Sequence, residues 1–173
     1  HREAGNGQLM GFRTLYMGTA EIACAPLKAL HYLPSCEIVS VLTQPDRPRG
    51  RSMKMQSSAV KQSAEKLGLA VLQPPTLCSD AVLEQLQSLQ ADLIIVMAFG
   101  QILPKSVLDL PKHGAVNIHA SILPRHRGAA PIQWAILEGD SETGVTIMKM
   151  DEGLDTGDII AVSRTPIQAT DNS

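Results

Sequence analysis

The sequence predicts an α/β fold with a mostly parallel sheet flanked by helices. Short apolar runs alternate with stretches in which apolar residues recur at helical spacing, as in repeated strand–helix–strand units. The 173 residues, 44% hydrophobic and 18% charged, suit a single globular domain with one core. The longest apolar runs, such as 93–98, are too short to cross a bilayer as a helix.

The first part of the chain predicts two strands around one helix. Residues 12–17 predict the first strand, and Gly18 and Thr19 after it are a pair typical of a tight strand-to-helix turn. Residues 21–33 place apolar side chains at helical spacing. Residues 37–43 are rich in β-branched residues, which favours a second strand.

Residues 44–58 interrupt this alternation. They contain two Pro, one Gly, three Arg and one Lys, with little apolar periodicity. We therefore expect one long loop here. Loops of this length inside a compact domain are usually functional.

The middle of the chain returns to the α/β pattern. Residues 59–67 predict a helix that ends at Gly68, and residues 69–72 predict a short strand. Ser79 is a suitable N-cap for a helix that continues through residue 89. Residues 91–98 are almost entirely apolar, which is typical of a strand buried on both faces.

The last part of the chain predicts two helices and three strands. Residues 105–110 suggest a short helix, and residues 115–119 suggest a strand. A helix is expected at 131–137, because Pro is favoured in the first helical turn. Two further strands, 144–150 and 158–165, are joined by a turn rich in Gly and Asp.

The composition excludes several classes of protein. The net charge of −2 creates no global attraction to nucleic acid or acidic lipid. One Trp, two Tyr and two Phe are too few for a sheet that stacks bases. Three cysteines without a CxxC pair argue against a disulfide framework or a zinc knuckle, and favour a reducing compartment. The sequence also lacks the GxGxxG, P-loop, GxSxG and HExxH motifs.

Asn117 and His119 stand two residues apart at the end of the predicted strand 115–119. Alternate residues of a strand point to the same face, so these side chains should project together, at the edge where open α/β sheets bind ligands. His119 can take or give a proton near neutral pH, and the Asn117 amide can donate to a developing oxyanion, which suits acyl transfer. Taken alone, the pair is better explained as a hydrogen-bonded polar pair.

Residues 151–158 place four carboxylates and two glycines within eight positions. Four carboxylates could bind a hard cation, but the spacing is not that of an EF-hand. The glycines predict a tight turn, in which one carboxylate could orient a histidine or a water. Taken alone, a solvated turn between strands is the better explanation.

Two further segments, residues 121–134 and 44–54, contain basic residues that could contact a ligand. Residues 121–134 mix apolar, basic and small residues directly after the Asn/His strand, as in a segment that wraps a ligand. A Pro-rich connection with incidental arginines is the alternative. Residues 44–54 are basic, and such arginines can contact phosphate backbones. Most short basic runs are only solvated faces, so charge alone is weak evidence.

Together, residues 117–128 and 151–157 resemble the two signatures of the 10-formyltetrahydrofolate-dependent formyltransferases, and the resemblance extends over about residues 10–173. Residues 43–51 resemble the arginine-rich loop of the branch that acts on methionyl-tRNA, which glycinamide ribonucleotide formyltransferases lack, and residues 128–133 point to the same branch. The resemblance implies a Rossmann-like formyltransferase fold. It also implies formyl transfer from 10-formyltetrahydrofolate to the α-amino group of methionyl initiator tRNA, for translation initiation.

The resemblance assigns catalytic roles to Asn117, His119 and Asp155. His119 would act as the base toward the α-amine, or as the acid toward the leaving N10 of the folate. Asn117 would hold the formyl oxygen as it becomes anionic. Asp155 would orient His119, stabilise its charged form or fix a water. No metal is implied, because the formyl group is already activated.

The resemblance also assigns binding residues. The folate would contact Ser121, Ile122, Leu123, Pro124, Ile102 and Leu103. The tRNA would contact Arg51, Arg47 and Lys54. The sequence departs from the family where Ile122 replaces Leu, Ala120 replaces a common Gly, and Ala20 replaces a frequent Pro. These changes are mild, and none removes a catalytic group.

The two ends of the chain suggest a domain cut short. Residues 1–9 precede Met10 and lack the apolar segment of a signal peptide, so we interpret them as a cloning remnant or a loose extension. Residues 170–173 are typical of a helix start. We interpret residues 10–173 as a formyltransferase catalytic domain truncated at its C-terminal end. The family's full enzymes continue into a C-terminal β-barrel that helps to hold tRNA, so we expect formyl chemistry here without efficient tRNA use.

Other functions stay open at this point. A formyltransferase of the same fold could act on a sugar-nucleotide amine or on glycinamide ribonucleotide, although the arginine-rich loop argues against this. A hydrolase that releases formate from formyl-folate would share the catalytic residues. A folate- or nucleotide-binding domain without turnover is a different class, which the intact Asn/His/Asp set disfavours. We expect a monomer without membrane association, in the bacterial cytosol or an organelle matrix.

Overall fold

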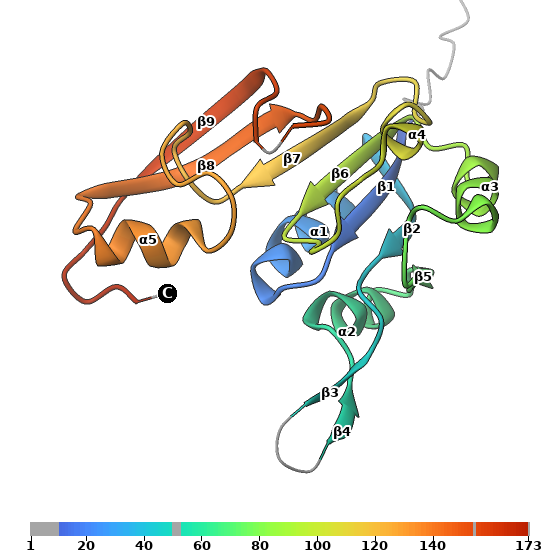
Figure 1. The fold of residues 1–173 in the computed structure, drawn as a ribbon, viewed down its shortest axis with the longest axis horizontal. Coiled ribbons are helices and arrows are strands. Elements are labelled where there is room, and N and C mark those ends of the chain that lie inside the picture. Colours follow the sequence, from blue (N-terminus) through green and yellow to red (C-terminus); the bar gives the residue numbers. More distant parts are fainter. Residues whose placement is uncertain (1–10, 50–52, 154, 173) are drawn as a thin grey trace, which may run out of the picture.

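The computed structural model describes residues 11–49, 53–153 and 155–172. The predicted extension at residues 1–9 and the predicted tRNA contact Arg51 therefore lie outside the described residues. The α/β architecture predicted from the sequence is confirmed, with a central, mostly parallel sheet and helices on its faces (Figure 1).

The central sheet has the strand order β5-β2-β1-β6-β7-β8-β9. Its strands are β1 (Phe12–Gly18), β2 (Cys36–Leu42), β5 (Val71–Leu72), β6 (Leu93–Met97), β7 (Ala115–His119), β8 (Glu142–Lys149) and β9 (Ile159–Pro166). The neighbours from β5 through β7 pair in parallel, whereas β8 and β9 pair antiparallel. The carboxyl ends of β2, β1, β6 and β7 therefore share one edge of the sheet.

The helices are α1 (Cys24–His31), α2 (Ala59–Lys66), α3 (Asp80–Ser88), α4 (Lys105–Leu108) and α5 (Pro131–Leu137). A 3-10 turn, η1 (Glu21–Ala23), precedes α1. Serine side chains begin two of the helices. The Ser58 hydroxyl accepts from the Lys61 N–H at 3.0 Å, and the predicted N-cap Ser79 accepts from Val82 N–H at 3.2 Å. Each bond satisfies one of the N–H groups that a first helical turn leaves unpaired.

The core has two parts, one on each face of the sheet. On one face, the buried Tyr16 of β1 packs with Leu27 of α1 and Val60 of α2. On the other, Leu15 of β1 packs with Leu86 of α3, together with α4. The alternation of Leu15 and Tyr16 between the faces is what a strand buried on both sides requires.

The turn after β1 is as tight as its Gly–Thr pair predicts. A Cβ on Gly18 would lie 2.9 Å from the Ala23 Cβ and 3.0 Å from the Met97 carbonyl oxygen. The buried Tyr16 hydroxyl donates to the Ala23 carbonyl at 2.6 Å, and burial raises the pKa of Tyr16. These contacts tie the start of the first helix to the sheet edge.

Residues 44–58 are not the plain loop that we predicted. They contain a hairpin of β3 (Arg47–Arg49) and β4 (Lys54–Gln56), which pair antiparallel outside the main sheet. The hairpin projects away from the sheet beside α2 (Figure 1). Periodicity could not reveal it, because a ribbon without a buried face needs no apolar alternation and tolerates Pro48 in a short edge strand.

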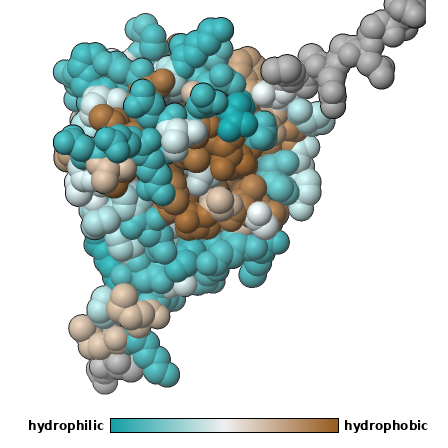
Figure 2. Space-filling view, turned by 90° about the vertical axis from the view of Figure 1, so that its right-hand side faces the viewer, coloured by the Kyte–Doolittle hydropathy of each residue, from teal (hydrophilic) through white to brown (hydrophobic). Residues whose placement is uncertain are grey.

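Three further observations complete the fold. The helix start predicted at residues 170–173 is a turn at residues 169–170, with no helix among the described residues that follow. The helices in the described part of the chain are all too short or too polar to cross a bilayer. One face of the molecule carries a hydrophobic hollow bordered by hydrophilic surface (Figure 2).

Candidate active site

A cavity of about 920 Å³ opens at the carboxyl edge of the sheet. The lining residues are 20–22 after β1, 96–103 at the end of β6 and beyond it, 117–120 at the end of β7, 128–133, and residues in and near the 151–158 turn. Most of the lining is apolar, and the polar lining residues Asn117, His119 and Asp155 mark what we call the polar end of the cavity. This is the position and character of ligand sites in open α/β sheets.

One carboxylate joins three segments at the polar end of this cavity. The Asn117 side-chain amide donates to Asp155 Oδ1 at 3.2 Å, and the Gly128 N–H donates to Asp155 Oδ2 at 2.8 Å. His119 Nδ1 lies 3.7 Å from the same Oδ2. Asn117, His119 and Asp155, the three residues to which the family resemblance assigns catalysis, therefore meet.

The ring of His119 is buried and held on both sides. Its Nε2 lies 2.8 Å from the carbonyl oxygen of His126, and its Nδ1 faces Asp155. A carbonyl can only accept, so this contact requires the proton on Nε2. In a neutral ring, Nδ1 then carries the lone pair and is the atom able to accept a proton.

The turn between β8 and β9 gives Asp155 its position. Asp155 has φ 52°, in the left-handed region that residues other than Gly rarely adopt. A Cβ on Gly157 would collide with the Lys149 carbonyl oxygen, so the turn requires Gly there. Asp151 holds the start of the turn by accepting from the Thr156 hydroxyl and the Gly153 N–H, each at 2.8 Å, and these bonds lower the pKa of Asp151.

Residues 121–124 do not reach the cavity. None of the described residues that line it comes from this segment. The buried Ser121 hydroxyl donates to the Arg125 carbonyl at 2.8 Å, and the Leu123 N–H donates to the Thr146 hydroxyl of β8 at 3.2 Å. The segment thus forms a turn behind the catalytic candidates. Direct folate contact by Ser121, Ile122, Leu123 and Pro124 stays a prediction.

Ile102 and Leu103 both line the cavity, as the predicted folate contacts should. Leu103 is buried in the core, whereas Ile102 is 89% exposed. A side chain so exposed beside an apolar cavity is available to a ligand. Both residues keep their predicted role as folate contacts.

The hairpin is anchored to the same edge of the sheet. At its base, Asp46 accepts from Lys61 Nζ at 2.8 Å and from the Gln73 amide at 2.7 Å, and these bonds, Lys61 first, lower the pKa of Asp46. The Gln44 N–H donates to the Thr19 hydroxyl at 3.2 Å.

The hairpin base is linked to the cavity wall through Thr19, whose hydroxyl donates at 2.6 Å to the carbonyl of the lining residue Phe99. Of the predicted tRNA contacts, Arg47 donates to the Gln44 side chain at 3.1 Å, and Lys54 is exposed. Arg51 lies outside the described residues. A basic, exposed ribbon thus begins beside the cavity.

The sequence did not reveal every group that shapes the site. The Gly128 N–H and the His126 carbonyl contact the catalytic candidates through the backbone, where side-chain identity carries no signal. Asp140, which holds the His126 side chain at 2.8 Å, stands outside both motifs. Only the folded chain brings these groups to His119 and Asp155.

Comparison with known proteins places this geometry in a family. The family described as "Formyl transferase" matches residues 13–173. The crystal structure of phosphoribosylglycinamide formyltransferase from Streptococcus pneumoniae TIGR4 superposes with a TM-score of 0.72 and 24% identity, covering 93% of this chain and 86% of that one. At that identity, the similarity establishes the fold.

Closer relatives are named methionyl-tRNA formyltransferase. The protein of that name from Trichlorobacter lovleyi is 52% identical over 160 residues, which cover 92% of this chain and 50% of the relative. The one from Neisseria meningitidis is 54% identical over 162 residues, covering 93% of this chain and 52% of the relative. The chain therefore spans about half the length of the curated relatives it matches.

The bridging role of Asp155 can be tested by Asp155→Asn. An amide has one acceptor oxygen and adds two N–H groups, so one of the two donors now bound would lose its partner. We expect the free energy of unfolding to fall by about 1–3 kcal/mol, as for other buried groups left unpaired. Urea denaturation measures this change.

The exposed Asp158 of the same turn provides the control. Asp158→Asn should change the unfolding free energy by less than about 0.5 kcal/mol. Equal losses in the two variants would show that the turn is sensitive to any loss of charge, and that Asp155 does not act as a bridge.

Proposed function

This chain belongs to the formyl transferase family, and we propose that it performs the catalytic part of formyl transfer from 10-formyltetrahydrofolate to the α-amino group of methionyl initiator tRNA. The meeting of Asn117, His119 and Asp155 at the polar end of an apolar cavity is the observation that carries the proposal. The chain is 52% and 54% identical in sequence to two proteins named methionyl-tRNA formyltransferase, and this similarity supports the choice of acceptor.

The cavity suits the proposed formyl donor. Its volume of about 920 Å³ lies within the range of about 300–1,000 Å³ typical of small-molecule sites. Apolar residues after β6, including Ile102 and Leu103, would cover the flat pterin ring. The polar end of the cavity would then receive the formyl group beside His119.

In the proposed reaction, a C–N bond forms between the methionyl amine and the formyl carbon, and the bond from that carbon to N10 of the folate breaks. A free α-amine has a pKa near 8, so it must lose a proton to become a nucleophile. His119 Nδ1 would accept the proton released as the amine attacks, and would return it to N10 as that nitrogen leaves. The transfer thus balances, with one formyl group and one proton moved.

Asn117 and Asp155 would stabilise the charges that arise during this transfer. The Asn117 amide has two N–H groups, so it can donate one to Asp155 and the other to the formyl oxygen as it becomes anionic. One such donor is worth about 3 kcal/mol in acyl transfer. The Asp155 carboxylate, 3.7 Å from Nδ1, would stabilise the imidazolium form of His119.

The exposed hairpin would contact the tRNA. It combines Arg47 and Lys54 with Arg51, and it begins at the sheet edge that holds the cavity. Basic side chains on such a ribbon can hold phosphates while the methionyl end reaches the cavity. The proposed reaction would place the protein where initiator tRNA is formylated, in the bacterial cytosol or an organelle matrix.

A direct assay tests this function. Formyl transfer from 10-formyltetrahydrofolate to charged initiator methionyl-tRNA would be measured for the 173-residue chain and for the complete product of its gene. We expect transfer by the complete product and weaker transfer by the chain, because the relatives are about twice as long. Folate binding without transfer to this acceptor would contradict the proposal and point to another amine or to hydrolysis.

The role of His119 is tested by His119→Ala in the same assay. We expect kcat to fall by about 100- to 10,000-fold, the usual contribution of a general base, with little change in affinity for tetrahydrofolate. His113→Ala, which removes an exposed histidine before β7, is the matched control and should keep normal turnover. Near-normal turnover in His119→Ala would reject the assignment of the base.

The role of the hairpin is tested by Arg51→Ala. Because the proposed contact is with a phosphate, we expect KM for methionyl-tRNA to rise about tenfold, which corresponds to about 1.4 kcal/mol. The affinity for folate should stay the same, and Lys112→Ala, at an exposed position before β7, should change neither quantity. Equal effects on tRNA and folate would indicate a structural role for the loop.

A further inference from the structure

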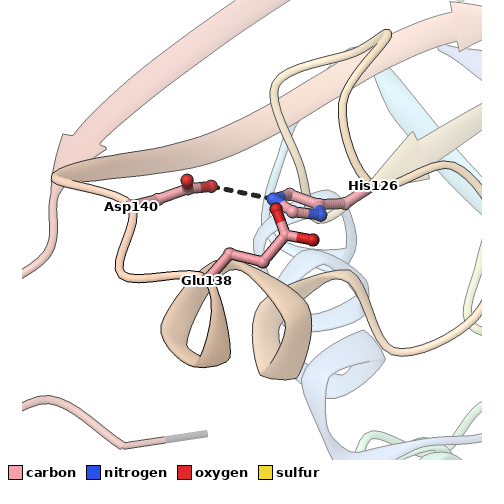
Figure 3. Close-up of side chains that lie close together, drawn as sticks. All are labelled: His126, Glu138 and Asp140. Atoms are coloured by element: carbon pink, nitrogen blue, oxygen red, sulfur yellow. Dashed lines mark hydrogen bonds and ion pairs between the residues drawn. The ribbon is translucent and has the colours of Figure 1, made fainter.

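A second polar cluster lies directly behind the candidate active site. His126 Nε2 lies 2.8 Å from Asp140 Oδ2, and both side chains are largely buried (Figure 3). Glu138 lies beside them, beyond the end of α5 (Figure 3). The proposed reaction uses none of these side chains, so their arrangement needs another explanation.

The cluster is a closed network of ion pairs and does not resemble a vacant metal site. The candidate ligand atoms of His126, Glu138 and Asp140 lie within 4.8 Å of one another, close enough for a cation. However, the Arg125 guanidinium lies 2.8 Å from Asp140 Oδ1 and 3.0 Å from Glu138 Oε2. It already supplies the positive charge that these carboxylates require.

The cluster holds a strained backbone in place. His126 has φ 56°, in the left-handed region, which is unfavourable for a residue other than Gly. The neighbouring residues are also fixed, since the Ser121 hydroxyl donates to the Arg125 carbonyl and the Gly128 N–H donates to Asp155, each at 2.8 Å. The side chain of His126 is fixed by Asp140, whose own N–H donates to the Ala135 carbonyl at 3.0 Å.

This strained turn points the carbonyl group of His126 at the ring of His119. The His126 carbonyl oxygen lies 2.8 Å from His119 Nε2, whereas Asp155 Oδ2 lies 3.7 Å from His119 Nδ1. A neutral imidazole has one N–H, and these two acceptors compete for it. The shorter contact places the proton on Nε2 and leaves Nδ1 free to accept another.

We propose that His126 and Asp140 are positioning residues that fix the tautomer of His119 through the His126 carbonyl. This inference rests on the role of His119 as the base in the proposed function. Without the His126–Asp140 bond, the turn can relax to an ordinary backbone conformation and withdraw the carbonyl. The single proton of the neutral ring then moves to Nδ1, beside Asp155, and the atom that should accept the substrate proton is blocked.

The test combines a spectroscopic measurement with kinetics. Two variants break the bond: His126→Phe, which keeps most of the side-chain volume, and Asp140→Ala, which removes the acceptor. His126→Gln restores a donor toward Asp140 and serves as the rescue. Glu138→Gln is the matched control, because Glu138 pairs with Arg125 but makes no hydrogen bond to His126 among the described contacts. The ¹⁵N shifts of the His119 ring in each variant report its tautomer, and the formylation assay reports kcat and KM.

We expect the neutral ring of His119 to carry its proton on Nε2 in the native protein and in Glu138→Gln. His126→Phe should shift the proton to Nδ1 and lower kcat by about 10- to 100-fold with little change in KM, the effect of losing the partner that orients a reactive side chain. Asp140→Ala should change both in the same direction, and His126→Gln should restore most of each.

An unchanged tautomer in His126→Phe would overturn the inference, and so would an equal loss in Glu138→Gln. Because the ring shifts are measured without substrate, the tautomer result holds even if the native protein formylates no methionyl-tRNA. Failure of the proposed function and failure of this inference are therefore separate outcomes.

Discussion

The carboxylate of Asp155 is the interaction on which the candidate active site depends. Its two oxygens bind Asn117 at the end of β7 and Gly128 in the following loop, while Asp155 itself belongs to the turn after β8. The left-handed backbone at Asp155 costs about 1–3 kcal/mol, whereas each hydrogen bond to a charged group contributes about 1.5–3 kcal/mol. The two bonds offset the strain, so the loop and the turn are held against a rigid strand.

His119 is likewise held by a rigid strand and by two strained turns. The end of β7 supplies the ring, and two turns with residues in the left-handed region place acceptors on its opposite sides. Strain of this kind persists only where the surrounding contacts determine the backbone, and it gathers at functional sites. The buried surroundings strengthen each of these polar contacts relative to water.

The candidate catalytic residues and the basic residues expected to contact a large substrate lie on different parts of the structure. The polar cluster is built on β7 and covered by two anchored turns, so its geometry is well defined. The hairpin of β3 and β4 instead extends from the sheet edge, and is tied to it by Asp46 and Gln44 at its base. A rigid scaffold with binding residues on projecting segments is a common solution in α/β proteins.

Local patterns in the sequence determined the order of strands and helices and the shared orientation of Asn117 and His119. Both follow from the spacing of apolar residues and from the conformational propensities of single residues, which depend only on neighbours a few positions away. Only the tertiary structure decided that Asp155, 38 residues from Asn117, meets that pair, that residues 121–124 are not among the lining residues of the cavity, and that residues 44–58 contain a hairpin. The same holds for the contact between His126 and Asp140. These features depend on backbone turns at single residues and on packing between distant segments, and neither leaves a periodic signal in the sequence.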